Sequence, residues 1–192
     1  MPETEIAQEL FMFGNASAAA AAEAKARPEV RLIEKIEAGD TEAFNDLYKM
    51  FAPMVHGILL AKVPYGEVQD IVQDVFLLAY KNLKTLRDKN TFGGWLATIA
   101  RNRAAEFHRG KRECEELSEE VGGARGVSAE ALEVLEVVRS MPAAYRETLV
   151  LRLVEGMTGI EIAERTGLTH ESVRVNLHRG MELLKKRLGI GK

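Results

Sequence analysis

Apolar residues recur along the chain at the spacing of an α-helix, and the pattern is clearest between residues 68 and 79. In that stretch the apolar positions are Val68, Ile71, Val72, Val75 and Ala79, which follow one another at intervals of three and four residues. Asp70 and Asp74 fall on another face of the same helix. Side chains three and four residues apart lie on one side of a helix, so the pattern predicts an amphipathic helix with one buried face.

Three further helices are predicted in the first half of the chain. The first runs from about Val30 to Gly39, and Asp40 is expected to cap the second. Pro53 is expected to break or kink that second helix, because proline has no backbone N–H to donate. A polar loop over residues 87–91 leads into the last helix of this half. The apolar positions that mark these helices are Val30, Ile33, Ile36, Phe44, Leu47, Tyr48, Phe51, Trp95, Leu96 and Ile99.

The second half is predicted to contain four short helices, and the last two of them form a helix-turn-helix. Pro142 opens the second of the four, at a position where its missing N–H costs little. Thr158 and Glu161 have the spacing of a capping box. Gly167 supplies a left-handed turn, and Thr169 caps the last helix directly afterwards. A short helix, a glycine turn and a capped helix are typical of this motif.

The last helix of the chain has one packing side and one basic side. Each residue advances about 100° around the helix axis, so Leu177, Leu184 and Leu188 lie near Val173. The opposite side carries Arg174, Val175, His178, Arg179, Lys185 and Lys186. Side chains at the front of such a helix are placed to read base edges in the major groove, and later lysines are placed to contact phosphates. Many helical proteins that never meet DNA share this pattern, so the motif alone leaves DNA binding open.

The composition agrees with a helical protein. Aromatic residues make up 6% of the 192 residues and only five residues are proline, which favours helices over sheets. We therefore expect an all-α fold. The single cysteine, Cys114, cannot form an internal disulfide, and no apolar run is long enough to span a bilayer. The N-terminus is acidic and then rich in alanine, unlike a signal peptide, so a cytoplasmic location without membrane insertion is expected.

The net charge of −3 hides an uneven distribution along the chain. Residues 86–112 hold seven Lys and Arg against two acidic residues, and residues 165–192 hold the same numbers. Between these two segments, residues 113–120 carry five glutamates. Two basic segments favour two contacts with a polyanion, although a basic helix face that is only solvated is about as common.

Four regions are expected along the chain: a tail at residues 1–29, a helical domain at 30–112, a linker at 113–128 and a second helical domain at 129–192. The linker is acidic, contains Gly122 and Gly123, and has too few apolar residues to fold alone. It is therefore expected to be flexible. Fully extended it reaches roughly 50 Å, which lets two small domains sit apart on a large partner.

The second half contains MPAAYRETLVL at 141–151, GIEIA at 159–163 and SVRVNLHRG at 172–180. These three segments resemble region 4 of the bacterial extracytoplasmic-function (ECF) sigma factors of the sigma-70 family. DIVQDVF at 70–76 resembles the region 2 helix that binds the polymerase clamp, and FGGWLATIARN at 92–102 resembles the promoter-melting segment. The blocks occur in the family's order across about residues 30–188. The resemblance implies a factor that directs core RNA polymerase to promoters and helps to melt them.

The resemblance also implies partners and site residues. The expected partners are core RNA polymerase, through its clamp and flap, promoter DNA, and an anti-sigma factor that occludes both domains. The residues expected to face the clamp are Asp70, Gln73, Asp74 and Phe76. Those expected at the minus-10 element are Lys89, Asn90, Thr91, Arg101, Arg109 and Arg112. Those expected at the minus-35 element are Thr169, Ser172, Arg174, Val175, His178, Arg179 and Lys185.

Some of these positions carry a second interpretation. Asn90 has the amide needed to read an unstacked base, but polar loops between helices are common. Trp95 is placed either to stack on a base or to pack in the core with Ile99. Asn176 and Glu106 depart from the family, which often has Arg and Asp there. The acidic linker either mimics RNA on its path through the polymerase or serves as a solvated spacer.

Two other classes of protein, an enzyme and a stand-alone DNA-binding regulator, are the alternatives to this interpretation. An enzyme is not expected, because the four histidines and Cys114 lack metal-ligand spacing and no nucleophile or phosphate-loop motif is present. No cofactor and no metal are expected either. A stand-alone helix-turn-helix regulator is the alternative that stays open, and it would bind duplex DNA tightly without polymerase.

Overall fold

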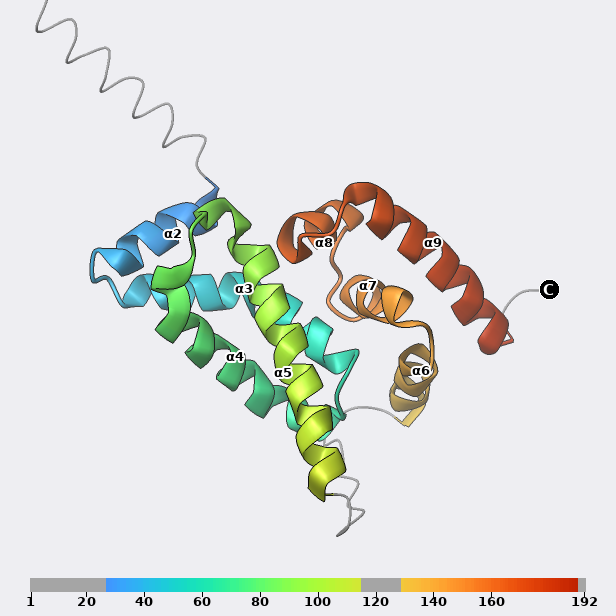
Figure 1. Ribbon diagram of the computed structural model, residues 1–192. Coiled ribbons are helices and arrows are strands. Elements are labelled where there is room, and N and C mark those ends of the chain that lie inside the picture. The colour runs from blue at the N-terminus through green and yellow to red at the C-terminus, as the bar shows by residue number, and fades with distance from the viewer. Residues whose placement is uncertain (1–26, 115–128, 190–192) are drawn as a thin grey trace, which may run out of the picture.

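The computed structural model describes residues 27–114 and 129–189, and every regular element in these ranges is helical (Figure 1). The expected all-α fold class is confirmed. The predicted tail, apart from residues 27–29, and the linker from residue 115 onward lie outside the described residues. In the first half the helices are α2 (Pro28–Glu37), α3 (Glu42–Leu60), α4 (Val68–Asn82) and α5 (Phe92–Cys114). In the second half they are α6 (Ala129–Arg139), α7 (Ala143–Leu153), α8 (Gly159–Thr166) and α9 (His170–Arg187).

Helix α4 has the buried face that its sequence predicts. Val68, Ile71, Val72, Val75 and Ala79 are all buried, and they face α3 and α5, the two helices that α4 contacts. Short 3₁₀ turns lie on either side of α4, at Tyr65–Glu67 and Leu83–Thr85. Hydrophobic periodicity alone was therefore enough to locate this helix and its inner face.

Pro53 was expected to break or kink the second helix, and helix α3 continues through it without a break. A proline inside a helix removes one backbone hydrogen bond. Buried apolar residues lie on both sides of the proline, and they include Phe51, Met54, Val55 and Ile58. Burying these side chains offsets the lost bond, so tertiary packing keeps the helix whole.

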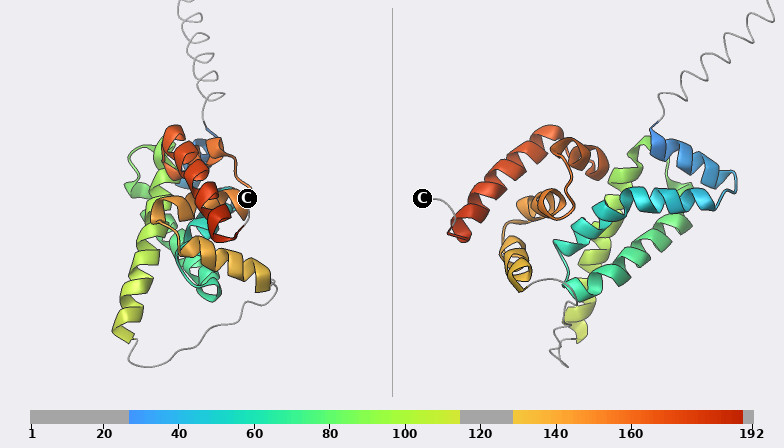
Figure 2. Two further views of the ribbon diagram at one scale, coloured as in Figure 1. Left: turned by 90° about the vertical axis from the view of Figure 1, so that its right-hand side faces the viewer. Right: turned by 180° about the vertical axis from the view of Figure 1, so that it is seen from behind.

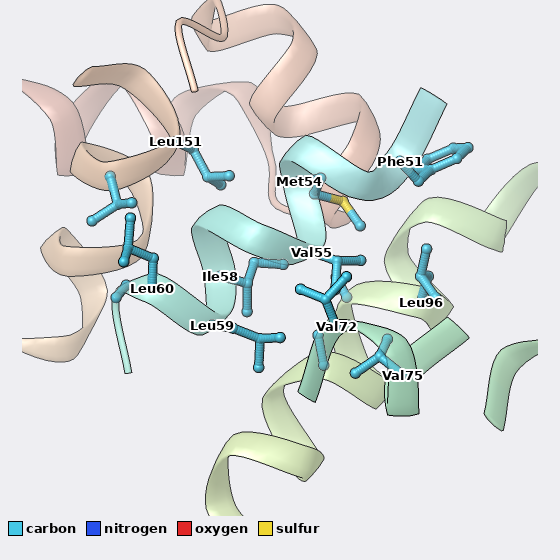
Figure 3. Packing of buried hydrophobic residues seen from close by; sticks show 14 of the residues in the cluster. Phe51, Met54, Val55, Ile58, Leu59, Leu60, Val72, Val75, Leu96 and Leu151 are labelled. Carbon is cyan, nitrogen blue, oxygen red and sulfur yellow. The ribbon is translucent and has the colours of Figure 1, made fainter. Parts of the chain in front are cut away.

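The two halves are packed against each other, which the sequence did not predict (Figure 2). Helix α7 lies on α3, and α8 lies on both α3 and α5. Leu151 of α7 is fully buried and points toward α3, where Met54, Ile58 and Leu60 are also buried (Figure 3). The buried apolar residues of both halves therefore form one continuous cluster. The expectation that the linker lets the two domains sit apart concerns the chain on a large partner, and it stays a prediction.

Candidate nucleic-acid interface

Local hydrogen bonds define the helix-turn-helix as predicted. The Thr158 hydroxyl accepts a bond from the Glu161 backbone N–H at 3.2 Å, and the Thr158 backbone N–H donates to the Glu161 carboxylate at 2.8 Å. Gly167 ends α8 with a positive φ of 76°, a conformation that glycine adopts without strain. Thr169 then caps α9 by accepting a bond from the Ser172 N–H at 3.1 Å. Both helices of the motif are thus capped by their own sequence.

The exposed side of α9 carries the predicted basic residues. Val173 and Leu184 are 1% and 5% exposed and pack inward. The side chains of Arg174, Val175, His178 and Arg179 line a shallow hollow of about 410 Å³ on the outer side. The last turn adds Lys185, Lys186 and Arg187. Six of the seven expected minus-35 residues therefore lie on α9, and the seventh, Thr169, caps it. The first three turns of this helix present guanidinium and imidazole groups.

Two of those seven residues, Thr169 and Ser172, cap the start of α9. The Thr169 and Ser172 hydroxyls lie 2.8 Å apart and bond to each other. His178 also has a local partner, because its Nε2 lies 3.7 Å from the Glu182 carboxylate. Arg174, Arg179 and Lys185 are exposed. The arginines of this face are therefore the best placed groups for contacts to base edges.

The capping box makes the stability of α8 depend on pH. The Thr158 backbone N–H and, after it, the Thr158 hydroxyl lower the pKa of the Glu161 carboxyl below its usual range. A lowered folded pKa adds stability above the unfolded value of about 4.3, and this stability is lost as pH falls through the folded pKa. We expect Glu161→Gln to lose less stability than the wild type between about pH 5 and pH 2, as measured by urea unfolding. Parallel pH profiles for the two proteins would contradict this expectation.

The loop expected at the minus-10 element contains a short 3₁₀ helix, Lys89–Thr91, that its own side chains hold. One oxygen of Asp88 accepts bonds from the Asn90 backbone N–H and from its side-chain amide, both at 3.0 Å. The Thr91 hydroxyl donates to the Asp88 carbonyl at 2.7 Å. Asn90 and Thr91 are exposed. The Asn90 amide N–H is thus held in place, while its side-chain oxygen has no partner among the hydrogen bonds of the described residues.

Lys89 is bound within the first half of the protein. Its ammonium lies 2.7 Å from the Glu37 carboxylate and 3.8 Å from that of Glu34, both on α2. The hydrogen bond to Glu37 raises the pKa of Lys89 above its usual range. The sequence did not reveal this contact, because the two segments lie about fifty residues apart.

Arg101 is paired with a residue of the second half, while its expected contact with DNA stays a prediction. Its Nη2 donates to Glu147 Oε1 of α7 at 2.6 Å, and its Nε lies 3.2 Å from both oxygens of that carboxylate. Glu147 is only 7% exposed. In this arrangement the Arg101 guanidinium forms hydrogen bonds that join the first half to the second. No local sequence signal marks the pair, because the residues lie 46 positions apart.

The remaining minus-10 residues lie toward the end of α5. The Arg109 side chain is 74% exposed, with the Glu106 carboxylate 4.0 Å away. Arg112 belongs to α5, but its side chain lies outside the described residues.

Trp95 is half-buried and its ring centroid lies 5.8 Å from that of Phe92. Trp95 is therefore a core residue here, the second of its two interpretations.

The outer face of α4 presents polar and apolar groups together. Asp70, Gln73 and Asp74 are exposed as expected, but Phe76 is 3% exposed. Phe76 is covered because its ring lies against Tyr48 and Phe44 of α3, with centroids 4.5 and 6.4 Å away. Sequence reasoning missed the exposed Leu77 and Tyr80, which complete an apolar groove of about 460 Å³ together with Thr41, Phe44, Tyr48, Gln73 and Phe76. Leu77 and Tyr80 fall outside the apolar face of α4 that the periodicity predicts, and this position was the sequence signal that could have shown them to be exposed.

No group of three or more His, Cys, Asp or Glu in residues 27–114 and 129–189 could hold a metal ion. None of the helices in the same ranges has the length and apolar character needed to cross a bilayer.

Two family models match this chain, one in each half. Sigma-70 region 2 matches residues 47–113, and Sigma-70, region 4 matches residues 131–184. The first match spans α4, α5 and most of α3, and the second contains the helix-turn-helix. The boundaries of the matches follow the division between the two halves.

Curated proteins resemble the chain over most of its length. The ECF RNA polymerase sigma-E factor of Escherichia coli (strain K12) is 30% identical over 176 residues, which cover 82% of this chain and 92% of that protein. RNA polymerase sigma factor CarQ of Myxococcus xanthus is 30% identical over 166 residues, which cover 82% and 95%. Among solved structures, the sigma factor RpoE in complex with the anti-sigma factor NepR, from Bartonella quintana, matches with a TM-score of 0.57 and 18% identity. That match covers 79% of this chain and all of the other.

Proposed function

Because this chain belongs to the ECF sigma factors of the sigma-70 family, it is an RNA polymerase sigma factor, and we propose that its two halves read separate promoter elements. The second half recognises the minus-35 element and the first half recognises and opens the minus-10 element. The observation that carries this proposal is the exposed face of α9, where Arg174, Val175, His178 and Arg179 surround one hollow. The protein acts through binding and not through catalysis.

The proposed minus-35 contacts divide by chemistry. Arg174 and Arg179 donate to guanine edges, since a guanidinium matches the two acceptors of guanine in the major groove. Val175 makes apolar contact and His178 adds a donor. Lys185 contacts the phosphate backbone, which positions the helix without reading sequence. Thr169 and Ser172 hold the start of α9 and offer their hydroxyls to a nearby phosphate.

The proposed minus-10 contacts fall on the 3₁₀ turn and on α5. Asn90 accepts a hydrogen bond from an unstacked base through its free side-chain oxygen, and Thr91 lies beside it. Lys89 forms ion pairs with two glutamates of α2 and thereby supports the turn. Arg109, Arg112 and, once released from Glu147, Arg101 contact the backbone of the duplex.

The proposed polymerase contact is the outer face of α4. Asp70, Gln73 and Asp74 supply its polar groups, and Leu77 supplies an exposed apolar group at the edge of the groove. Phe76 supports this face from below and makes no direct contact, because its ring is covered. The clamp is the partner proposed for this face, and the flap is the partner proposed for the second half.

Transcription in vitro tests the proposal. Purified protein and bacterial core polymerase are mixed with a genomic fragment library, and the start sites are sequenced. Starts that share two upstream motifs support the proposal. Absence of starts, together with tight and specific binding of the free protein to duplex DNA, would instead favour a stand-alone regulator.

Asp74→Ala is expected to weaken binding to core polymerase about tenfold, because it removes one charged contact worth about 1.4 kcal/mol. Titration of labelled protein with core polymerase measures the change. Asp46→Ala is the matched control, since Asp46 is also an exposed aspartate, on α3. Equal affinities for the two variants would remove α4 from the proposed interface.

An anti-sigma factor is proposed as a further partner. The solved structure of RpoE with NepR is the precedent, and its likeness to this chain is one of fold. The exposed apolar groups of this chain, such as Leu77 and Ile160, are suited to an apolar partner segment.

A further inference from the structure

We propose that Glu171, at the start of α9, is a specificity-determining residue of the minus-35 contact, and that its carboxylate accepts a hydrogen bond from the exocyclic amino group of a cytosine. This inference rests on the proposed function, in which the outer side of α9 lies in the major groove. It adds an acidic reader to a surface that otherwise reads bases through cationic groups. The cytosine lies within about two base pairs of the base that Arg174 contacts.

Glu171 lies on the outer side of α9. It is exposed, whereas Val173, two residues later, is 1% exposed and packs inward. At about 100° per residue, Glu171 and His178 are about 700° apart, so they lie within about 20° of one line along the helix. Arg174 falls about 60° to one side of this line and Val175 about 40° to the other. Glu171 is therefore in line with the middle of the surface that surrounds the hollow.

The position of Glu171 along the helix axis also favours a contact with a base. Glu171 is the second residue of α9, which runs from His170 to Arg187. The residues at the N-terminal end of a recognition helix are those that contact base edges. Arg174 lies three residues later, about 4.5 Å farther along the axis. Successive base pairs are about 3.4 Å apart, so Glu171 and Arg174 reach the same base pair or close neighbours.

The Glu171 carboxylate is not used to cap its own helix. Thr169 already caps α9 by accepting a hydrogen bond from the Ser172 N–H at 3.1 Å. In α8 the acid of the first turn, Glu161, turns back instead and accepts a bond from the Thr158 backbone N–H at 2.8 Å. Glu171 forms neither a hydrogen bond nor an ion pair with another of the described residues. Both of its carboxylate oxygens are therefore available to a ligand.

An unpaired acid weakens a DNA-binding surface unless it binds a base. Glu182, the other acid on the outer side of α9, lies 3.7 Å from the imidazole Nε2 of His178. Glu171 has no such neighbour, so the phosphates of the duplex repel it. A hydrogen bond from a base offsets this repulsion. The unpaired carboxylate therefore favours sequences that place a suitable donor in the groove.

Cytosine is the base whose edge matches a carboxylate. A carboxylate only accepts hydrogen bonds. In the major groove cytosine presents an amino group, which donates, whereas guanine and thymine present only acceptors. Adenine has an amino group as well, but its neighbouring N7 is an acceptor that repels the second carboxylate oxygen. Glu171 therefore selects cytosine over the other three bases.

Substitution of Glu171 should change the base preference at one position of the minus-35 element. Glu171→Ala removes the acceptor, and a preference for cytosine of about fivefold or more should disappear at that position. Glu171→Gln supplies an acceptor and a donor at nearly the same size, which together match adenine. Its preference should therefore move from cytosine to adenine. An acid that only interacts with the helix dipole would affect stability and leave every base preference unchanged.

Transcription from a randomised promoter measures these preferences. The start sites that the wild type and bacterial core polymerase produce locate the minus-35 motif, and one such promoter is then randomised across that motif with its minus-10 element unchanged. A barcode in each transcript identifies its promoter, so base frequencies are obtained at every position. Glu164→Gln is the matched control, because Glu164 is an exposed glutamate of α8, the first helix of the motif. It removes the same charge and should leave the base frequencies unchanged.

A cytosine preference of the wild type that is absent in Glu171→Ala and replaced by adenine in Glu171→Gln supports the inference. Base frequencies that are the same in the wild type and in both variants would overturn it, as would an equal change in transcription from all sequences. Circular dichroism and binding to core polymerase establish that each variant is folded. Failure of the proposed function is distinct, because the wild type itself would then show no base preference at a minus-35 element.

Discussion

Replacement of Arg174 and Arg179 together by alanine is expected to lower promoter-directed transcription about a hundredfold. Each arginine lies exposed on the first turns of α9 and lines the same hollow. A bidentate contact from arginine to guanine contributes about 1–3 kcal/mol of discrimination against the wrong base. Two such losses add to about 2–6 kcal/mol, and the expected hundredfold effect corresponds to about 2.8 kcal/mol, toward the lower end of that range.

Run-off transcription with saturating core polymerase measures this loss, and binding to polymerase should stay unchanged. Lys185→Ala is the comparison, because Lys185 is exposed on the last turn of the same helix. It should weaken binding to all sequences alike and reduce the salt dependence by about one phosphate contact. Loss of polymerase binding in the double variant, or equal loss at promoters and at random DNA, would contradict a role in reading bases.

Phe92→Ala is expected to destabilise the protein by about 3–5 kcal/mol, the usual range for removal of a buried phenylalanine ring. Phe92 is 0% exposed, and its ring meets that of Phe51 edge to face at a centroid distance of 5.0 Å. It also begins α5 directly after the 3₁₀ turn that holds Asn90. The cavity would therefore loosen the start of α5 and the proposed minus-10 turn together.

Thermal unfolding followed by circular dichroism checks this prediction. A loss of this size should lower the midpoint by about 6–20 °C in a chain of this length. Leu77→Ala serves as the control, since Leu77 is 57% exposed and its truncation should change stability by less than about 0.5 kcal/mol. Equal midpoints for Phe92→Ala and the control would show that this ring is not part of the stabilising core.

Local signals in the sequence were enough to predict the helix-turn-helix in detail. Thr158, Glu161, Gly167 and Thr169 act on backbone groups within three or four residues of themselves. The periodicity of α4 was equally reliable, because a helix repeats its faces at a fixed interval. The placement of the basic residues on the outside of α9 follows from the same regularity.

Sequence reasoning was incomplete where the surroundings of a residue depend on a distant part of the chain. Phe76 was expected to face the polymerase and is buried, because the rings of Phe44 and Tyr48 cover it from another helix. Pro53 was expected to break or kink α3, and the helix does not break there, because apolar residues are buried on both sides of the proline. The sequence of one helix does not show which neighbouring side chains will cover it, and in both cases those neighbours determine the burial.

The sequence by itself determined the helices, their caps, their amphipathic faces and the basic surface of α9, because these depend on interactions within a few residues. Only the tertiary structure decided how the two halves meet. The pairing of Arg101 with Glu147 and the fit of Gly57 against Leu151 join residues that lie 46 or more positions apart. Such contacts depend on the shapes of two folded surfaces, and helical periodicity carries no information about which surfaces will meet.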